Sequence, residues 1–392
     1  MGANILKRAA ACTTAMLLIF ESHPIQYRVP VYQCMERLRA GACKVIFGTD
    51  GSARGHVDPG FAREVKWDLP LLEGYPFQVL HNQRGASLEH RSSLHGRGVS
   101  ALLRRERPAA VLLNGLVYQM DFTAYFSALR LGIPVWLRSE TQDAAFVRRA
   151  PKSLLRRACY TLLYRPLRRA FYIGELNRRH LLRHGVSEQR LRPARYCVAD
   201  PLRGVSQVGK QQRRDVTRAG LGIGANEFVV AFFGKLTPKK NPGLLFAAFE
   251  QLPESLRQRT RLLFVGSGEL ETELRGQNQR AIFPGFINQR ALADHYLAAD
   301  VVVLPSRRLG ETWGLVVNEA LQAGCAAVVS DAVGCAEEFK TWERVRVFPE
   351  GDAAGLAAHV TELSARSRDF DWCREQLSDY SIEAAARALL AP

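Results

Sequence analysis

The feature that most constrains the fold is an alternation of short apolar runs with longer amphipathic segments, which occurs in both halves of the chain. The apolar runs are MLLIF, CKVIFG, AAVLLNG, IPVWLRS and AFYIG, followed by FVVAFFG, RLLFVGSG, DVVVLPS and AAVVSD. Short apolar runs that end in Gly or Ser and are separated by helical patterns predict parallel strands covered by helices on both faces. The predicted fold class is therefore α/β, with two doubly wound domains in series.

The two halves are separated by a polar stretch without apolar periodicity, RGVSQVGKQQRRDVTR, at residues 203–218. We therefore predict an N-terminal domain over residues 1–202, a linker over 203–218 and a C-terminal domain over 219–370. The remaining residues, 371–392, are predicted to be helical and to pack back on the N-terminal domain. Ligands of doubly wound folds bind beyond the carboxyl ends of the strands, so we expect a cleft between the two domains.

The N-terminus resembles a signal peptide, because Lys7 and Arg8 are followed by the apolar stretch AAACTTAMLLIF. This stretch is too short to span a bilayer, and it runs into ESHPIQYRVP without a small-residue cleavage site. We interpret AMLLIF as the first buried strand instead. Met16 is an alternative start, which would make residues 1–15 an extension.

The charge of the chain indicates an anionic partner. There are 54 Lys and Arg against 38 Asp and Glu, a formal net charge of +16, which suits phosphate, nucleic acid or a membrane surface. Residues 148–195 hold fourteen Lys or Arg against two Glu. Apolar side chains recur there at helical spacing: Leu154, Leu155, Ala158, Cys159, Leu162 and Leu163. Two interpretations stay open, a solvated surface whose stripe faces the core and a site for an anionic membrane.

The cysteines give no sign of a metal or redox site. Eight are present, with no CxxC pair and no zinc-finger spacing. A reduced, intracellular protein is the expected setting.

Three lysines follow a predicted buried strand of the second half, in the stretch FFGKLTPKKNPGLLFAAFEQL at residues 232–252. They are Lys235, Lys239 and Lys240. Positive charges at the carboxyl end of a strand are well placed to neutralise phosphates, because Coulomb attraction strengthens as water is excluded. The position favours a binding role for Lys235 and Lys240 more than for Lys239.

Two carboxylates flank a predicted helix start in LGETWGLVVNEALQAGCAAVVSD, residues 309–331. Gly314 lies where the helix should begin, so the neighbouring backbone N–H groups are accessible to a phosphate. Glu311 lies just before this point and Glu319 lies in the second turn of the predicted helix. Carboxylates accept hydrogen bonds from neighbouring hydroxyls, so each could hold one sugar of a nucleotide sugar.

The stretch PSRRLGETWGLVVNEALQAGCAAVVSDAVGC resembles family 4 glycosyltransferases, the retaining, nucleotide-sugar-dependent class with the GT-B fold. The spacing of Glu311 and Glu319 matches the E-x7-E motif of that family. Similar stretches are GKLTPKK from Gly234, LLFVGSGEL from Leu262, PGFINQ from Pro284 and the N-terminal SHPIQYRVP. The resemblance covers nearly the whole chain, and its second half is the more specific part. It implies a C-terminal domain that binds the donor and an N-terminal domain that binds the acceptor.

The resemblance also implies residue roles. Lys235 and Lys240 would bind the donor diphosphate and stabilise its departure, with Glu311 beside the transferred sugar and Glu319 on the ribose hydroxyls. The implied donor-binding residues are Gly234, Gly285, Phe286, Ile287, Thr312, Trp313, Gly314, Leu315, Val316 and Glu319. No metal and no other cofactor is expected, since amines and a helix terminus replace the cation. The leaving phosphate would assist deprotonation of the acceptor hydroxyl, and the barrier would fall through electrostatic stabilisation and orientation.

The chain departs from the family in its N-terminal half. Many relatives carry a His after the fourth strand, where this chain has Asn114 and Gly115, and SHPIQYRVP replaces a glycine-rich loop. His23 is the remaining candidate for a catalytic histidine, and stabilisation of its own loop is the open alternative. The candidates for acceptor binding are Tyr27, Arg28, Asn114, Arg138 and Glu140. Arg138 and Glu140 could instead pair with each other.

The sequence therefore predicts a retaining, metal-independent glycosyltransferase of cell-surface polysaccharide or glycoconjugate synthesis. Its acceptor would be a glycan, a lipid-linked glycan or a small molecule. We expect it in the cytoplasm, with residues 148–195 able to contact the inner face of the plasma membrane. One alternative is a basic nucleic-acid- or membrane-binding protein without transferase activity, although no RNP-like pattern supports a nucleic-acid partner. Another is an epimerase or sugar phosphorylase on the same fold. The donor nucleotide, the sugar and the acceptor stay open.

Overall fold

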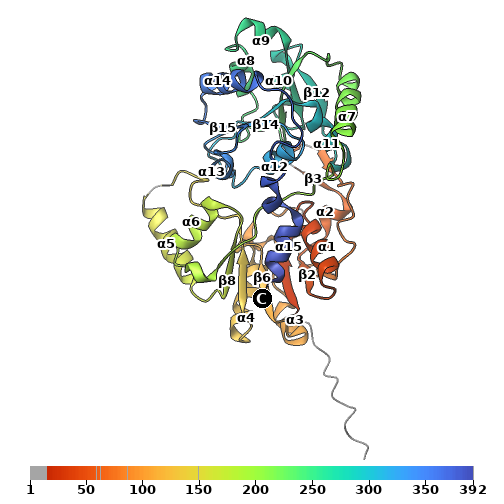
Figure 1. Ribbon diagram of the computed structural model, residues 1–392. Helices are drawn as coiled ribbons and strands as arrows, with labels where there is room; N and C mark the ends of the chain where they lie inside the picture. Colours follow the sequence, from red (N-terminus) through yellow and green to blue (C-terminus); the bar gives the residue numbers. More distant parts are fainter. Residues whose placement is uncertain (1–15, 59, 62, 86, 149, 392) are drawn as a thin grey trace, which may run out of the picture.

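The computed structural model describes residues 16–391 with the exception of residues 59, 62, 86 and 149 (Figure 1). Two parallel sheets dominate the described part of the chain. The first has seven strands in the order β5-β2-β1-β6-β7-β8-β9. Their bounds are β1 Leu17–Glu21, β2 Cys43–Phe47, β5 Phe77–Val79, β6 Ala110–Leu113, β7 Val135–Arg138, β8 Arg169–Tyr172 and β9 Leu191–Pro193. A short antiparallel hairpin, β3 (His56–Asp58) and β4 (Arg63–Val65), follows β2.

The second sheet has six strands in the order β12-β11-β10-β13-β14-β15, the arrangement of a doubly wound nucleotide-binding domain. Their bounds are β10 Phe228–Phe233, β11 Thr260–Val265, β12 Ile282–Gly285, β13 Val301–Leu304, β14 Ala326–Ser330 and β15 Val345–Phe348. The predicted α/β class with two doubly wound domains is confirmed.

Helices cover both faces of each sheet. Those of the first domain are α1 Val29–Leu38, α2 Gly51–Arg54, α3 Val99–Glu106, α4 Gln119–Arg130, α5 Ala150–Tyr164 and α6 Glu175–Arg183. The later helices are α7 Gln207–Gly220, α8 Leu244–Phe249, α9 Glu254–Arg259, α10 Glu271–Gln277, α11 Gln289–Ala298, α12 Leu315–Gln322, α13 Ala336–Phe339, α14 Ala353–Ser364 and α15 Ile382–Leu390. Every residue of β1 and of β10 is buried, because the two faces of each sheet both carry apolar layers.

The last helix returns to the first domain. In Figure 1 α15 lies beside α1. Ala385, Ala386 and Leu389 join the apolar cluster that contains Val31 and Met35. The chain therefore crosses between the two domains twice, which ties them together.

The predicted linker at 203–218 is mostly helical, and this part of the prediction was wrong. Helix α7 begins after Ser206, whose hydroxyl accepts a hydrogen bond from the Gly209 amide at 3.1 Å. Its inward face consists of Lys210, Arg214 and Arg218, which are only 1%, 7% and 4% exposed. The apolar pattern of the sequence did not predict this helix, because its buried face consists of basic side chains that pair with acids.

The described residues contain no helix that is both long and apolar enough to span a membrane. The run AMLLIF does supply the first strand, β1. The question whether residues 1–15 are an extension before Met16 lies outside the described residues.

Candidate functional site

A cavity of about 520 Å³, here called the interdomain cavity, lies at the carboxyl ends of strands from both sheets. The second domain lines it with Gly234, Lys235, Lys240, Phe286, Ile287, Glu311, Thr312, Trp313, Gly314, Leu315, Val316 and Glu319. The first domain contributes His23, Tyr27, Phe61, Trp67 and Glu140 among others. Most residues of the predicted donor site are thus brought together, although Gly285 is not in the lining.

Lysines form one wall of the interdomain cavity. The Lys240 Nζ lies 2.5 Å from Oε2 of Glu311, and the same oxygen accepts a hydrogen bond from the Ser306 hydroxyl at 3.2 Å. Lys239 turns away from the lining and donates to the Gly310 carbonyl at 3.0 Å. Burial lowers the pKa of Lys239, and the charges of Lys240 and Lys235 lower it further against the opposing effect of Glu311. The loop after β10 is therefore a concentrated region of positive potential.

Behind these lysines, the backbone segments that follow β10 and β11 lie close together. Gly266, after β11, has φ +139°, and a Cβ at this position would lie 1.9 Å from the carbonyl oxygen of Gly234. Glycine is required there because no side chain fits between the two loops. The close approach leaves the cavity floor lined by backbone.

Helix α12 points its N-terminus at the cavity. It begins at Leu315, directly after Gly314, which adopts a left-handed conformation with φ +102°. Trp313 is buried and donates from Nε1 to Asn318 Oδ1 at 2.8 Å, so the turn is anchored in the core. Gly314, Leu315 and Val316 line the cavity, so an anion there would lie at the helix N-terminus, where backbone amides favour negative charge.

Glu319 lies in the second turn of α12 and also lines the cavity. The Tyr296 hydroxyl donates to Glu319 Oε2 at 2.6 Å, and the Tyr296 ring stacks on Phe233 at 3.7 Å between centroids. Burial raises the pKa of Glu319 to about 7, against the hydrogen bond from Tyr296. Burial therefore favours the protonated form of this carboxyl.

Aromatic rings from both domains form the opposite wall. Phe286 contacts the Phe61 ring edge-on at 5.0 Å and the Trp67 ring at 6.1 Å between centroids. The Lys235 ammonium lies 5.0 Å from the Phe61 centroid. The Phe61 carbonyl in turn accepts a hydrogen bond from Ser267 at 3.0 Å. The segment around β3 and β4 thus reaches the second domain and bounds the cavity.

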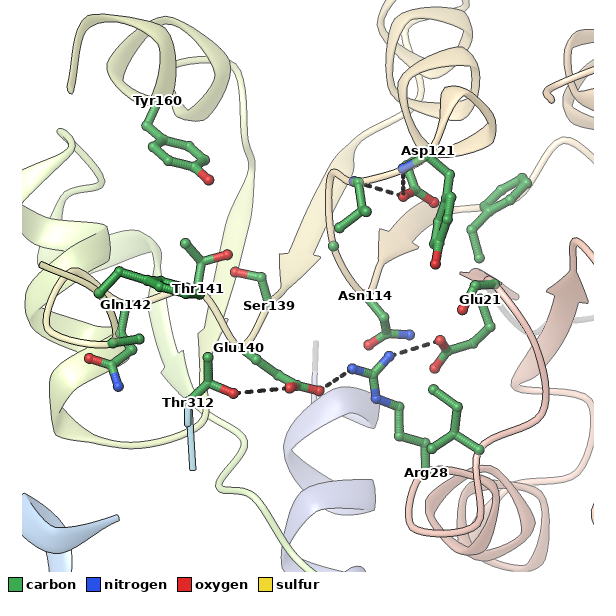
Figure 2. Close-up of a pocket in the computed structure, with 18 of the residues that line it drawn as sticks. Glu21, Arg28, Asn114, Asp121, Ser139, Glu140, Thr141, Gln142, Tyr160 and Thr312 are labelled. Atoms are coloured by element: carbon green, nitrogen blue, oxygen red, sulfur yellow. Dashed lines mark hydrogen bonds and ion pairs between the residues drawn. The ribbon is translucent and has the colours of Figure 1, made fainter. Parts of the chain in front are cut away.

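A second cavity of about 410 Å³, the first-sheet cavity, opens beside the interdomain cavity (Figure 2). It lies at the carboxyl ends of β1, β6 and β7 and is lined by polar groups that include Glu21, Asn114, Asp121, Ser139 and Tyr160. Three residues line both cavities: Ile25, Glu140 and Thr312. A ligand in one cavity can therefore reach a ligand in the other at these side chains.

Arg28 organises the floor of the first-sheet cavity. Its guanidinium donates to Glu21 at 2.8 Å and to Glu140, as Figure 2 shows. The Tyr196 hydroxyl also donates to Glu140, and the Thr312 hydroxyl donates to its other oxygen at 3.3 Å. Although burial opposes ionisation, the charge of Arg28 and these hydrogen bonds lower the pKa of Glu140. Burial raises the pKa of Glu21. Of the two carboxylates that contact Arg28, Glu140 is therefore the more firmly ionised, and it lies where the two cavities meet.

The acceptor-side candidates separate into two groups. Arg28, Asn114 and Glu140 line the first-sheet cavity, and Glu140 also lines the interdomain cavity, together with Tyr27. His23, the candidate for a catalytic histidine, lines the interdomain cavity as well. The ring nitrogen Nδ1 of His23 lies 2.9 Å from the Ser22 hydroxyl.

Arg138 does not join these groups. It is buried and donates to the carbonyls of Ala194 and Arg195 at 3.2 and 3.3 Å. It does not line either cavity among the described residues, and Glu140 pairs with Arg28 instead. Its placement indicates a structural role.

Several cavity residues were not predicted from the sequence. Tyr196 and Tyr296 hold the two carboxylates Glu140 and Glu319, and Glu21 anchors Arg28. Glu21 directly follows the predicted strand AMLLIF, and this position indicates a residue at the edge of the cleft. The tyrosines occupy positions that an ordinary core aromatic would fill, so no local pattern distinguishes them.

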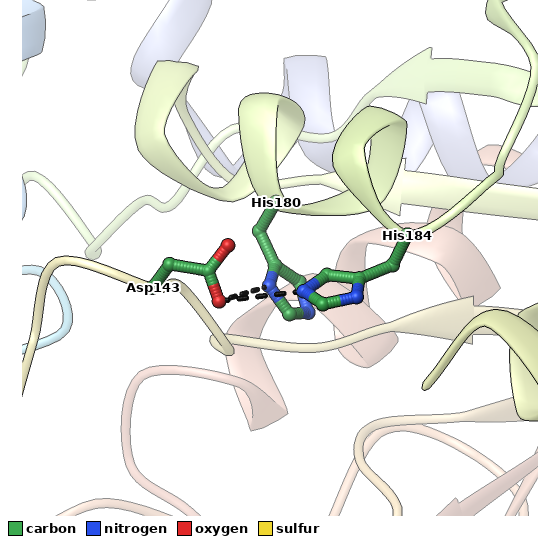
Figure 3. Close-up of side chains that lie close together, drawn as sticks. All are labelled: Asp143, His180 and His184. Atoms are coloured by element: carbon green, nitrogen blue, oxygen red, sulfur yellow. Dashed lines mark hydrogen bonds and ion pairs between the residues drawn. The ribbon is translucent and has the colours of Figure 1, made fainter. Parts of the chain in front are cut away.

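Asp143, His180 and His184 lie close together in one cluster (Figure 3). Asp143 Oδ1 lies 3.0 Å from His180 Nδ1 and 3.4 Å from His184 Nε2. The residue types suit a metal ion, but Arg156 binds the same oxygen and Arg183 binds the other at 3.4 Å. Two guanidinium charges oppose a dication. The cluster fixes the loop after β7 to α5 and α6.

Comparison with known proteins places these features in a family context. Residues 213–383 match the family model described as Glycosyl transferases group 1. A D-inositol 3-phosphate glycosyltransferase of Rhodococcus erythropolis is 37% identical over 202 residues, which cover 45% of each chain. An uncharacterized glycosyltransferase of Methanocaldococcus jannaschii is 34% identical over 129 residues, 31% of this chain and 32% of that protein. The chain thus aligns with less than half the length of these relatives.

The fold extends over the whole chain. The crystal structure of Anabaena HepE in complex with UDP and glucose has a TM-score of 0.63 at 18% identity, covering 96% of this chain and 94% of that chain. The architecture is the GT-B fold. The segment that matches the family model contains both lysines and both glutamates of the interdomain cavity.

Proposed function

We propose that the protein is a retaining glycosyltransferase that moves a sugar from a nucleotide-diphosphate sugar to an acceptor hydroxyl. One observation carries the proposal: Lys235, Lys240, the N-terminus of α12 and the carboxyl groups of Glu311 and Glu319 converge on one interdomain cavity. Amines and exposed amides suit a diphosphate, and carboxylates suit sugar hydroxyls.

The donor fits this cavity in one orientation. Its diphosphate lies between the two lysines and the first turn of α12, where positive charge and amide dipoles are concentrated. Glu319 accepts hydrogen bonds from the ribose, and Glu311 lies beside the transferred sugar. The base lies toward Phe286 and Ile287. HepE was crystallised with UDP and glucose, so UDP is the first nucleotide to test.

In the proposed step the bond between C1 of the sugar and the β-phosphate oxygen breaks, and its electron pair stays with the nucleoside diphosphate. The acceptor oxygen bonds to C1 on the same face, and its proton passes to the departing diphosphate. The lysines and the α12 amides stabilise the negative charge that develops on this leaving group. We propose that no divalent cation takes part, because these groups supply the positive charge that a cation would otherwise provide.

The acceptor fits the first-sheet cavity. Its reacting hydroxyl would meet the sugar at Glu140 and Thr312, which line both cavities. Arg28 keeps Glu140 ionised, so the carboxylate can accept hydrogen bonds from acceptor hydroxyls. Carboxylates and hydroxyl groups dominate the floor, which favours a polyhydroxylated acceptor such as a glycan or a cyclitol. The Rhodococcus relative is a D-inositol 3-phosphate glycosyltransferase, which is consistent with that class.

We further propose that α5 brings the enzyme to an anionic membrane at the inner face of the plasma membrane, where lipid-linked intermediates of cell-surface glycans occur. Most of the apolar stripe of this helix does not face the core: Leu154, Leu155 and Leu162 are 70%, 68% and 72% exposed, whereas Leu163 packs against the core of the first domain. Lys152 and Arg157 lie among them and are exposed as well. Exposed leucines next to basic side chains are typical of helices that lie in a membrane interface.

The decisive test of the activity is release of nucleoside diphosphate that depends on an acceptor. The full chain is incubated with a panel of UDP-, GDP- and ADP-sugars in the presence of chelator, with and without D-inositol 3-phosphate and a total lipid extract. We expect one donor to release its nucleoside diphosphate only when an acceptor is present. We also expect the product to have the same anomeric configuration as the donor. Conversion of the sugar nucleotide into an epimer without acceptor would contradict the proposal.

A further inference from the structure

A third cavity of about 210 Å³, the arginine cavity, lies at the opposite edge of the second sheet from the donor site. Phe228 begins β10, Asp300 precedes β13 and Ala326 begins β14, so the cavity faces the amino ends of these strands. It shares no lining residue with the interdomain cavity. Whatever binds there does so independently of the lysine loop.

Six arginines line the arginine cavity against two acids. The lining arginines are Arg214, Arg218, Arg259, Arg344, Arg366 and Arg368, and the acids are Glu227 and Asp300. Ser364, Ser367 and Asn226 add further hydrogen-bonding groups. So many guanidinium groups around a small space repel one another unless an anion lies between them.

Both acids are already neutralised. The Asp300 carboxylate forms two ion pairs: Oδ1 lies 2.5 Å from the Arg214 guanidinium, and Oδ2 lies 2.7 Å from the Arg218 guanidinium. Glu227 pairs with Arg261 at 2.7 Å and Arg280 at 3.6 Å, which lie outside the lining. Neither carboxylate is therefore available to balance the remaining arginines.

Three of the lining arginines lack a close carboxylate among the described residues. Arg259 and Arg368 have no ion pair with an acid, and the Arg344 Nε approaches Glu343 only to 3.9 Å. Their guanidinium groups stack on Phe228, Phe370 and Trp372.

The Nε atoms of Arg344 and Arg368 are both buried, and neither has a hydrogen-bond partner in the part of the chain that the structure describes. Buried N–H groups are almost always paired in folded proteins, so two of them beside one cavity indicate a missing acceptor. Burial lowers the pKa of the neighbouring Arg214, and the charges of Arg368 and Arg218 lower it further although Asp300 opposes them.

We infer that the arginine cavity is a second anion site, separate from the donor site, which binds the phosphate group of a small ligand. Guanidinium groups match the oxygens of a phosphate with paired N–H donors. At about 210 Å³ the cavity is smaller than the roughly 300–1,000 Å³ of sites for drug-sized ligands. The ligand is accordingly inorganic phosphate, pyrophosphate or a compact phosphate monoester, and not a whole sugar nucleotide.

Calorimetric titration tests this inference on the full chain. The Lys235→Ala/Lys240→Ala protein is used throughout, because it removes the competing lysines of the interdomain cavity. Inorganic phosphate, pyrophosphate and glucose 6-phosphate are titrated separately at low ionic strength. One bound anion per chain is expected, with affinity that falls as salt is added. Tighter binding of the inorganic anions would identify a free phosphate as the ligand, and tighter binding of the ester would identify a phosphorylated metabolite.

Arginine variants in the same background locate the site. Arg259 is exposed, so Arg259→Gln leaves the fold intact and should weaken binding several-fold. Arg259→Gln/Arg368→Gln should weaken it by about tenfold or more. The control Arg387→Gln alters an exposed arginine of α15 that pairs with Glu383 and should change nothing. Absence of saturable binding by all three anions, equal weakening by the control, or binding of oligonucleotides but not of small phosphates would overturn the inference.

Discussion

Lys240 is the residue on which the proposed chemistry depends most directly. Its ammonium lies 2.5 Å from Glu311 in the interdomain cavity. Lys240→Ala should lower kcat by about 10²–10³-fold, the cost of removing one group that stabilises an oxyanion. Lys239→Ala is the matched control, because Lys239 donates to the Gly310 carbonyl and turns away from the cavity. Steady-state kinetics of both variants check this, and equal activity of Lys240→Ala and wild type would exclude the lysine from the reaction.

Glu319 should make stability depend on pH. Burial raises its pKa to about 7 in the folded state from an ordinary value of 4.5. The folded chain therefore holds a proton that the unfolded chain loses as the pH rises from 4.5 to 7, and stability falls over that window. Glu319→Gln removes this effect, so it should gain on the order of 1–3 kcal/mol relative to wild type between pH 5 and pH 8. Urea unfolding at both pH values measures the gain, and a constant difference would contradict the raised pKa.

The residues that line the cavity were predictable from sequence only where their position after a strand carried the information. Lys235, Lys240 and Glu311 follow buried strands, and the cavity does contain them. The partner of Glu140 was not predictable, because Arg28 reaches it from the residue just before α1, more than a hundred residues earlier in the chain. Contacts between distant side chains depend on how the loops pack, which no local pattern records.

At the scale of elements, the sequence identified the central strands and missed the edges. All nine apolar runs are strands, whereas β5, β9, β12 and β15 were not predicted. These four are the outer strands of the two sheets. An edge strand is buried less completely, as in β5 and β12, which contain no fully buried residue, so it needs no continuous apolar run.

Helix α5 is the element whose exposed face requires an explanation. Leu154→Ser/Leu162→Ser should weaken binding to vesicles that contain anionic lipid, because both side chains are mostly exposed and can enter the interface. Stability should change by less than about 0.5 kcal/mol, as for other surface substitutions. Val208→Ser/Val216→Ser on α7 is the control, with side chains 67% and 74% exposed. Vesicle co-sedimentation decides, and equal binding by both double variants would argue against α5 as the contact.

At the scale of the whole molecule, specific contacts hold the two domains around the cavity. A Cβ on Gly174 of the first domain would lie 2.3 Å from the Trp313 ring of the second. The Gly310 amide donates to the Ala145 carbonyl at 2.9 Å. The pattern of apolar runs predicted two domains and a cleft, but it could not predict these contacts, because they join surfaces that are remote in sequence.

Gly174→Val should force the two domains apart at this contact. The added side chain overlaps the buried Trp313 ring, so the free energy of unfolding should fall by about 1–3 kcal/mol. Gly220→Ala is the control, since a Cβ there meets no atom within 4 Å. Thermal unfolding followed by tryptophan fluorescence measures the effect, and an unchanged midpoint for Gly174→Val would show that this interface does not constrain the domains.

The most direct measurement of the central claim is calorimetric titration of the full chain with nucleoside diphosphates in the presence of excess chelator. We expect at least one of UDP, GDP and ADP to bind, with one molecule per interdomain cavity. We also expect Lys235→Ala/Lys240→Ala to weaken this binding at least about 100-fold. Binding that appears only when a divalent cation is added, or that persists undiminished in the double variant, would contradict the claim.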